Sequence, residues 1–375
     1  MARHLVLVGG GHAHLTVLKH LDRFTRGDRQ ATVISRSAYH YYSGMGPGML
    51  SGAYRPREIR FHVRKMTEDR RGRFVEDSVV RVDPRERVLY LKRGAPVSYD
   101  VVSFNTGSTV AFDAPRATGR ATAFPVKPIE NLLAAREAVR RRAGRGPLTL
   151  CVAGGGPAGI EIAASLRSLV RQEGGRAEIL LVAGDRLLSH IDNRRLRACV
   201  ARELGRQEVT LVEGKRLLAA ADGSVALSDG SSIRADMTLL ATGTRPSRLF
   251  RDSGLTTGVD GGLLVDETLR AVDHPDMFGG GDCITFAPKP LDRVGVHAVR
   301  ENPILMHNLA AAVAGRTEFR KYTPQRAYLL ILNMGDGRGV FFRNGLVWCG
   351  RAAFRLKDYI DRRFMKQFQV SGEAG

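Results

Sequence analysis

The sequence predicts an α/β fold with two Rossmann-like units, the second inserted in the first, and a small C-terminal α+β segment that ends in an amphipathic helix. Two glycine-rich stretches carry this prediction, LVLVGGGHAHL at residues 5–15 and CVAGGGPAGIEIA at residues 151–163. In each, an aliphatic run typical of a buried strand is followed by glycines and then by a helical pattern. A glycine turn at a helix N-terminus is typical of a dinucleotide phosphate site, so the repeat indicates two bound dinucleotides.

The first glycine loop is incomplete. Gly9 and Gly11 fill two positions of the G-x-G-x-x-G pattern, and His14 stands at the third. His12 and Ala13 lie inside this loop and are predicted to belong to the cofactor-binding residues. We expect His14 to pack where the helix meets the strand. His12 and His14 are two residues apart on a helix and do not share a face, so no metal site is predicted here.

The second glycine loop is complete, because Gly154, Gly156 and Gly159 fill all three positions. They are predicted to hold the second dinucleotide.

Neither unit has the usual acid at the end of its second strand. Such an acid binds a ribose hydroxyl of the dinucleotide. The strand at residues 31–35 ends in Ser35 and Arg36, whose hydroxyl and guanidinium can meet a ribose and a phosphate. In the second unit Asp185 and Arg186 come later, so NADH and NADPH remain open alternatives.

Apolar periodicity and turn residues predict the remaining elements. The glycine-rich residues 39–52 are expected to form an irregular loop that borders a flat ring. A hairpin is expected at residues 225–233 and strands within residues 322–350. Helices are predicted at residues 13–23, 129–142, 160–171, 294–314 and 352–368, with an interruption near Pro303.

The composition is that of an ordinary globular protein with a strong positive charge. The chain has 375 residues, 43% of them hydrophobic, and a net charge of +20. No apolar run of about 18 residues is present, and a strand begins too early to leave room for a secretory signal, so we expect a cytoplasmic protein. The charge favours an anionic partner, either a lipid surface, nucleic acid or the cofactors themselves. No nucleic-acid motif is found, and no specific nucleic-acid partner is expected.

The four cysteines predict no metal site and no local redox pair. Cys151, Cys199, Cys283 and Cys349 are widely spaced and form no C-x-x-C motif. Isolated cysteines of this kind are most often buried thiols, which is the expectation here.

Taken in order, the motifs resemble those of the pyridine nucleotide–disulfide oxidoreductase superfamily. They are LVLVGGGHAHL, SYDVVSFNTG, CVAGGGPAGIE, MTLLATGTRP and HPDMFGGGD followed by GVHAVRENP. The pattern is similar to the branch of type II NADH dehydrogenases and sulfide:quinone oxidoreductases, and within it to flavoproteins found fused to selenide, water dikinase. The resemblance implies an FAD domain at residues 1–115 and 255–320, an NAD(P)H domain at 116–254, and a membrane- or partner-facing segment at 321–375.

The resemblance also assigns roles to residues by position. Glu161 falls where type II dehydrogenases carry a glutamate beside the nicotinamide and flavin rings, and it is an implied catalytic residue together with His297. Gly243 lies in the second of the family's two Thr-Gly turns, within the NAD(P)H domain. For FAD the implied residues are Gly9, Gly11, Ser35, Arg36, Ser43, Gly44, Val80, Thr106, Gly107, Gly281 and Asp282.

The implied activity is electron transfer from NAD(P)H through FAD to a quinone or similar acceptor. The run 295–300 stands where type II dehydrogenases have A-Q-x-A-x-Q, but both glutamines are missing. His297 or Arg300 can supply hydrogen bonds there instead. Two alternatives stay open: a sulfide:quinone or selenium-linked flavoprotein oxidoreductase, and a flavin-bound redox sensor or scaffold without catalysis.

The C-terminal helical pattern is amphipathic and basic. Leu356, Ile360, Phe364 and Phe368 repeat at every fourth position, flanked by arginines and lysines. Such a helix suits a lipid interface, so we expect peripheral attachment to the cytoplasmic face of the membrane. The alternative is packing on the body of the protein, or on a second subunit in a homodimer.

Overall fold

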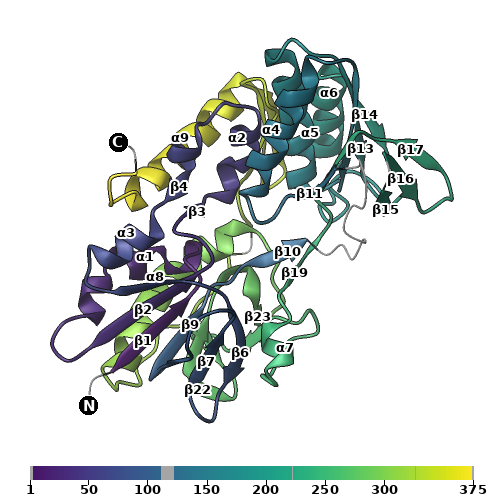
Figure 1. The fold of residues 1–375 in the computed structure, drawn as a ribbon. Helices are drawn as coiled ribbons and strands as arrows, with labels where there is room; N and C mark the ends of the chain where they lie inside the picture. The colour runs from purple at the N-terminus through teal and green to yellow at the C-terminus, as the bar shows by residue number, and fades with distance from the viewer. Residues whose placement is uncertain (1–2, 111–121, 222, 326, 374–375) are drawn as a thin grey trace.

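Two sheets of mainly parallel strands form the framework of the protein (Figure 1). The computed structural model describes residues 3–110, 122–221, 223–325 and 327–373. The larger sheet has eight strands in the order β23-β20-β21-β22-β9-β1-β2-β5. We call it, with its helices, the first unit. Its strands are β1 (His4–Val8), β2 (Gln30–Ser35), β5 (Arg73–Glu76), β9 (Val101–Phe104), β20 (Leu263–Val265), β21 (Arg270–Ala271), β22 (His274–Gly279) and β23 (Ile284–Phe286).

The second unit has a five-stranded parallel sheet in the order β11-β18-β12-β13-β14. Helix α5 contacts three of its strands, and α4 and α6 contact its outer strands. The strands are β11 (Thr122–Pro125), β12 (Leu148–Ala153), β13 (Ala177–Val182), β14 (Val209–Val212) and β18 (Met237–Leu240), and the helices are α4 (Asn131–Ala143), α5 (Pro157–Gln172) and α6 (Arg194–Arg206).

The centres of the two units repeat each other. Strand β1 lies between β2 and β9, and β12 lies between β13 and β18, with all pairs parallel. The N–H of Gly9 donates to the carbonyl of Ile34, and that of Gly154 to the carbonyl of Val182, both at 2.8 Å. The predicted α/β class with two Rossmann-like units is therefore confirmed.

The chain passes between the units at two neighbouring points. Strand β10 (Ser108–Val110) pairs antiparallel with β19 (Thr244–Pro246). The strands of the second sheet fall between these crossings in the chain. The proline-, glycine- and alanine-rich residues 113–128 also indicate a crossing between domains, and residues 113–121 of this stretch lie outside the described residues.

Smaller sheets complete the chain. The predicted hairpin is formed by β16 (Ser224–Leu227) and β17 (Ser232–Arg234), joined by β15 (Leu217–Ala221). Near the C-terminus, β24 (Leu330–Asn333), β25 (Gly339–Arg343) and β26 (Leu346–Gly350) form an antiparallel sheet that contacts α9 (Arg351–Phe368). Two more small sheets contain β3 (His40–Tyr41) with β4 (Arg60–Phe61), and β6 (Val79–Asp83) with β7 (Val88–Leu91) and β8 (Val97–Ser98).

Two helix predictions are wrong in detail. The helix expected at 13–23 is divided into a 3-10 turn η1 (His12–His14), α1 (Leu15–Lys19) and a second turn η2 (Leu21–Phe24), because the backbone of His20 leaves helical geometry at φ −120°. Conversely, α8 (Gly295–Val313) runs through Pro303 without the expected interruption. Tertiary contacts offset the loss of one backbone hydrogen bond there, since Asn302 Oδ1 accepts a hydrogen bond from the N–H of Thr16 at 2.7 Å.

The glycine-rich stretch 39–52 also differs from the expected irregular loop. It contains β3, a 3-10 turn η3 (Ser43–Met45) and the short helix α2 (Gly46–Leu50). Pro47 lies in the first turn of α2, where a proline costs no hydrogen bond. Met49 and Leu50 are buried, and α2 packs against α4 and α5 of the second unit.

The expectation of four buried thiols is half wrong. Cys199 of α6 and Cys349 of β26 form a disulfide, with a Cα–Cα distance of 6.7 Å. They are 150 residues apart in sequence, so no local spacing could reveal the pair. Cys151 and Cys283 are free and buried, as expected.

The apolar stripe of α9 does not form one lipid-facing surface, which corrects the sequence prediction. The Phe364 ring packs on Tyr42 with a centroid distance of 4.9 Å, and Phe368 is buried against Phe61. Tyr359 and Ile360 remain 61% and 39% exposed. The helix therefore uses half of its stripe to close the first unit. No helix in the described ranges is long and apolar enough to cross a bilayer.

Candidate active site

The first glycine loop is shaped by Asn105, which sequence reasoning missed. A Cβ added to Gly11 would lie 1.7 Å from Asn105 Oδ1, and one added to Gly9 would lie 2.2 Å from the Asn105 carbonyl oxygen. Gly9 also has φ +90°, which other residues rarely adopt. The Asn105 amide donates to the carbonyl of Gly280 at 2.6 Å and so ties the loop to the Gly281 turn. Its signal in the sequence is its position just before the first Thr-Gly turn.

His14 packs at the contact of strand and helix, as predicted. Its Nδ1 donates to the Gly9 carbonyl at 2.7 Å, and its Nε2 accepts from the Ser103 hydroxyl at 2.8 Å. Complete burial lowers the pKa of His14 to about 4, so the ring is neutral at pH 7. In the second unit a Cβ on Gly159 would lie 1.8 Å from the Gly154 carbonyl. In the first unit the helix begins as the 3-10 turn η1, and the His14 side chain fits at the position that Gly159 occupies in the second unit.

Both units leave buried donors and open space beside their glycine loops. Among the described residues, His12 Nε2 and the hydroxyls of Thr106 and Thr242 are buried without a hydrogen-bond partner. Such groups are rare unless a ligand or water satisfies them. A Cβ added to Gly107, Gly156 or Gly243 would meet nothing within 4 Å. The residues of both loops therefore fit a bound dinucleotide.

The end of β2 has an acid nearby that sequence reasoning missed. Ser35 is half-buried and pairs in register with Glu76, the last residue of the adjacent strand β5. The Glu76 carboxylate is ion-paired with Arg64, and Arg36 is exposed. Val80 lies at an irregularity of the strand ladder, because the register between β6 and β7 shifts from Val79 to Arg81. Its role at the adenosine end of the FAD site, like that of Ser35 and Arg36, stays a prediction.

Asp282 is held by two residues from the crossing between the units. Its Oδ2 accepts from the Ser108 hydroxyl at 2.8 Å and is ion-paired with Lys127 Nζ at 2.5 Å. The preceding residue, Gly281, has φ +72° and donates its N–H to Glu301. Burial raises the pKa of Glu301 to about 7. Lys127 and Glu301 carried no motif that would have marked them.

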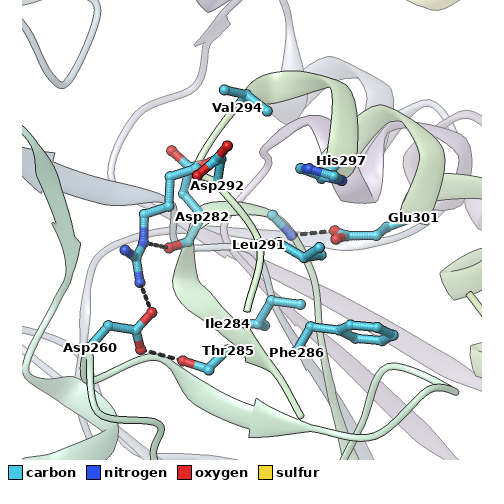
Figure 2. A pocket seen from close by; sticks show the side chains of 12 residues that line it. Asp260, Asp282, Ile284, Thr285, Phe286, Leu291, Asp292, Val294, His297 and Glu301 are labelled. Atoms are coloured by element: carbon cyan, nitrogen blue, oxygen red, sulfur yellow. Dashed lines mark hydrogen bonds and ion pairs between the residues drawn. The ribbon is translucent and has the colours of Figure 1, made fainter. Parts of the chain in front are cut away.

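His297 lines a small pocket with Asp282 and Glu301 (Figure 2). The ring lies on the first turn of α8, and Nδ1 is hydrogen-bonded to the Tyr322 hydroxyl at 2.9 Å. Burial lowers the pKa of His297, so the ring is neutral at pH 7. Gly295 opens the same helix, and a Cβ added there would lie 3.7 Å from Ser43 Oγ. The segment predicted to border the flavin therefore reaches the start of α8.

Glu161 belongs to a second group, which we call the junction cluster: Tyr42, Glu161, Lys357 and Asp361. Glu161 is buried on the second turn of α5, and its Oε1 accepts the N–H of Asn333 in β24 at 2.7 Å. Burial raises the pKa of Glu161 to about 7, opposed by the nearby charge of Lys357.

The rest of the junction cluster comes from α9 and the flavin-border segment. Lys357 Nζ donates to the Gly44 carbonyl and to Asp361 Oδ2, both at 2.7 Å. The Tyr42 hydroxyl donates to Asp361 Oδ1 at 3.1 Å. Sequence reasoning missed Lys357 and Asp361, whose signal is a Lys-Asp pair four residues apart beside an apolar stripe. The cluster joins both units and the C-terminal segment.

The two predicted catalytic residues lie in different groups. Glu161 is in the junction cluster, and His297 lines the pocket of Figure 2. The segment with Ser43 and Gly44 lies between them, since Ser43 is beside Gly295 and the Gly44 carbonyl accepts from Lys357.

Comparisons with known proteins agree with this architecture. The model of the pyridine nucleotide-disulphide oxidoreductase family matches residues 3–310. The chain is 22% identical to a type II NADH:quinone oxidoreductase of Staphylococcus aureus over 402 aligned residues, which cover 98% of this chain and 96% of that protein.

Solved structures show the same fold at lower identity. The sulfide:quinone oxidoreductase of Aquifex aeolicus superposes with a TM-score of 0.80 at 16% identity and covers 100% of this chain and 93% of that one. NDH2 of Plasmodium falciparum, in complex with NADH, has a TM-score of 0.80 at 13% identity and covers 98% and 99%. The resemblance to this superfamily and to its branch of type II NADH dehydrogenases and sulfide:quinone oxidoreductases is confirmed, while the narrower resemblance to flavoproteins fused to selenide, water dikinase stays a prediction. The chain belongs to the pyridine nucleotide-disulphide oxidoreductase family.

Proposed function

We propose that this protein is an FAD-dependent oxidoreductase that passes electrons from NAD(P)H to a quinone or a similar acceptor. The observation that carries the proposal is the pair of glycine loops, each with a buried, unpartnered threonine hydroxyl, Thr106 in the first unit and Thr242 in the second. FAD, when bound, supplies the acceptance of hydride and the onward transfer of electrons. The relatives named above include NADH and quinone oxidoreductases.

In this proposal the first unit holds FAD. Gly9 and Gly11 let the backbone approach the pyrophosphate, and the Thr106 hydroxyl gains its missing partner. The Asp282 carboxylate, which now pairs with Lys127, accepts a hydrogen bond from a ribityl hydroxyl of FAD. The N-terminus of α8 at Gly295 favours negative charge on the cofactor.

The second unit holds NAD(P)H in the same way. Gly154, Gly156 and Gly159 border the pyrophosphate, and α5 begins directly after this loop. Glu161 then lies on the helix that points at the dinucleotide. With a pKa of about 7 it can hold or release a proton at neutral pH, and Lys357 lies close enough to stabilise the charged form.

The membrane part of the proposal rests on the exposed half of the α9 stripe. Tyr359 and Ile360 are exposed next to Arg355 and Arg363, which are also exposed. Apolar side chains flanked by cations suit an anionic lipid surface. We therefore propose peripheral attachment to the cytoplasmic face of the membrane, where a quinone is reached. A homodimer through the same helix is the competing outcome.

The cysteines do not favour sulfide chemistry. Cys283 follows Asp282 directly, but burial raises the pKa of its thiol to about 11, so the thiol stays protonated. The other free cysteine, Cys151, is buried in β12 and its pKa is raised to about 12. A free cysteine takes part in sulfur transfer as a thiolate, and neither of the two free cysteines, Cys151 and Cys283, provides one.

Stopped-flow mixing of the FAD-loaded protein with NADH, NADPH or sulfide tests the proposed activity. We expect the flavin absorbance to bleach with a nicotinamide donor and to recover on addition of a soluble quinone analogue. Bleaching by sulfide alone would support the sulfide alternative, and no bleaching by any donor would leave only the sensor or scaffold. Liposome co-sedimentation of the wild type and of Tyr359→Ser/Ile360→Ser tests the membrane contact, which equal binding of the two would contradict.

A further inference from the structure

We propose that the second unit is built for NADPH rather than NADH, with Arg216 as the residue that recognises the 2′-phosphate. This inference rests on the proposed function and narrows it to one coenzyme. Sequence reasoning left the two coenzymes open, because no motif marks Arg216. The structure brings it to the end of β13.

A cavity of about 340 Å³ opens at the carboxyl ends of β12 and β13. In Rossmann units the adenosine ribose binds beside the end of the second strand, which here is β13. The lining joins the glycine loop, the end of β13 and the second Thr-Gly turn, and includes Gly154, Ala183, Gly184, Asp185, Arg216 and Thr242.

The end of β13 has no place for the acid that selects NADH. Ala183 is buried and faces the glycine loop. A Cβ added to Gly155 would lie 2.7 Å from the Cβ of Ala183. A longer side chain at 183 would press on that loop. Gly184 has φ +62°, a conformation that side-chain-bearing residues rarely adopt. The backbone therefore disfavours a carboxylate at both positions that directly follow the strand.

Arg216 lies over this gap on a fixed backbone. Its N–H donates to Ser228 Oγ at 2.9 Å, and its carbonyl accepts the N–H of Ser228 at 2.8 Å. A Cβ on Gly184 would lie 3.8 Å from Arg216 Cγ, so the side chain crosses the end of β13. A single nitrogen, Nη2, contacts the Asp185 carboxylate, at 3.0 and 3.2 Å. Nε and Nη1 take no part in that pair, so each keeps an N–H group that can donate to a phosphate oxygen.

The charges around the cavity favour a phosphate over a hydroxyl. Asp185 is the acid that could bind the 2′-hydroxyl of NADH, but both its oxygens contact Arg216. Arg186, the next residue, is not among the residues that line the cavity, and its guanidinium is 3.9 Å from the exposed Asp192. Arg216 is therefore the lining cation that can attract a dianionic phosphate.

Calorimetric titration of the FAD-loaded protein with 2′,5′-ADP and with ADP tests the inference without any turnover. We expect 2′,5′-ADP to bind at least about tenfold more tightly, since charge-assisted contacts to a phosphate are strong. Arg216→Ala should remove most of this difference by weakening the binding of 2′,5′-ADP, and it should not weaken the binding of ADP, because Asp185 is then free to meet the 2′-hydroxyl. The matched control is Lys215→Ala, on the same loop, because Lys215 Nζ is already ion-paired with Asp229 at 2.7 Å. It should keep the preference.

Equal or tighter binding of ADP by the wild type would overturn the inference, as would a loss of preference in Lys215→Ala equal to that in Arg216→Ala. Absence of binding by both ligands would overturn it too. Stopped-flow reduction by NADPH and NADH separates this inference from the proposed function. If neither coenzyme bleaches the flavin but 2′,5′-ADP is preferred, the oxidoreductase proposal fails and the phosphate site stands. Faster reduction at lower concentration by NADH would overturn the NADPH preference alone.

Discussion

Lys357 and Asp361 form a buried ion pair across one turn of α9, with 2.7 Å between Nζ and Oδ2. Lys357 also binds the Gly44 carbonyl, and Asp361 also binds Tyr42. The pair therefore attaches the C-terminal helix to the segment predicted to border the flavin. It also brings a positive charge close to Glu161.

Removing one partner of this ion pair should lower the stability of the fold. Lys357→Met leaves a buried carboxylate without its cation, and we expect the free energy of unfolding to fall by about 3–5 kcal/mol. The double variant Lys357→Met/Asp361→Leu removes both charges and should recover much of that loss. Urea denaturation of the three proteins measures both effects. If the free energy of unfolding of Lys357→Met lies within about 0.5 kcal/mol of the wild-type value, the change is that of an ordinary surface substitution and the pair is not buried in solution.

The buried, neutral ring of His14 should make the stability of the protein sensitive to acid. Its pKa is about 4 in the folded protein and 6.5 in an ordinary environment, so the unfolded chain binds more protons between these values. Stability should therefore be lost as the pH falls from 6.5 towards 4, by roughly 2 kcal/mol at pH 5 from this residue. His14→Gln keeps a donor for Gly9 and an acceptor for Ser103 but cannot be protonated.

The comparison of wild type and His14→Gln isolates this effect. Glu161 and Glu301 have pKa values raised to about 7, so they make the opposite contribution, with stability lost as the pH rises from about 4.5 to 7. Thermal unfolding at pH 7.5 and pH 5 should show a larger acid loss for the wild type than for the variant. Identical losses would mean that His14 is not buried as a neutral ring.

Glu161 predicts the pH dependence of turnover. If the carboxyl donates the proton that the acceptor takes up, the rate should fall as the pH rises through about 7, the pKa that burial sets for Glu161. Glu161→Gln should have a lower rate with no such transition, while its FAD content stays that of the wild type. Steady-state rates with a nicotinamide donor and a quinone analogue from pH 5.5 to 9 check this. An unchanged transition in the variant would assign it to another group.

We expect a substitution of Gly11 to abolish most of the FAD binding. Gly11→Ala places a Cβ 1.7 Å from Asn105 Oδ1, so the loop must move away from its present geometry. We expect the purified variant to retain less than about a tenth of the wild-type FAD, because close backbone approach to the phosphates is lost. Gly144→Ala is the control, since a Cβ there meets nothing within 4 Å. Absorbance at the flavin band relative to protein gives the ratio, and full FAD retention in Gly11→Ala would contradict this placement of the cofactor.

Local chemistry explains what could be predicted from the sequence. A glycine loop, the strand before it and the helix after it are neighbours in the chain, so Gly9, Gly11 and the second loop were found from spacing alone. His14 was placed correctly because the third glycine position always faces the strand.

Long-range contacts explain what could not. The junction cluster, the Cys199–Cys349 disulfide and the Lys127–Asp282 ion pair each join residues more than 100 positions apart in the chain. The amphipathic pattern of α9 showed an apolar face but not what covers it, and Phe364 and Phe368 were assigned to lipid for that reason. The assignment of FAD rather than NAD to the first loop came from family resemblance.

The pairing of β9 with β22 has a consequence for how the chain folds. Met277 lies opposite Val102 in the eight-stranded sheet, and the whole second unit stands between them in the chain. Contacts of such long sequence separation form slowly, because the intervening chain must first be brought together. During synthesis β9 therefore presents an open strand edge until β22 leaves the ribosome. A slow-translating or truncated chain would be exposed to aggregation at this edge even while its second unit is already folding.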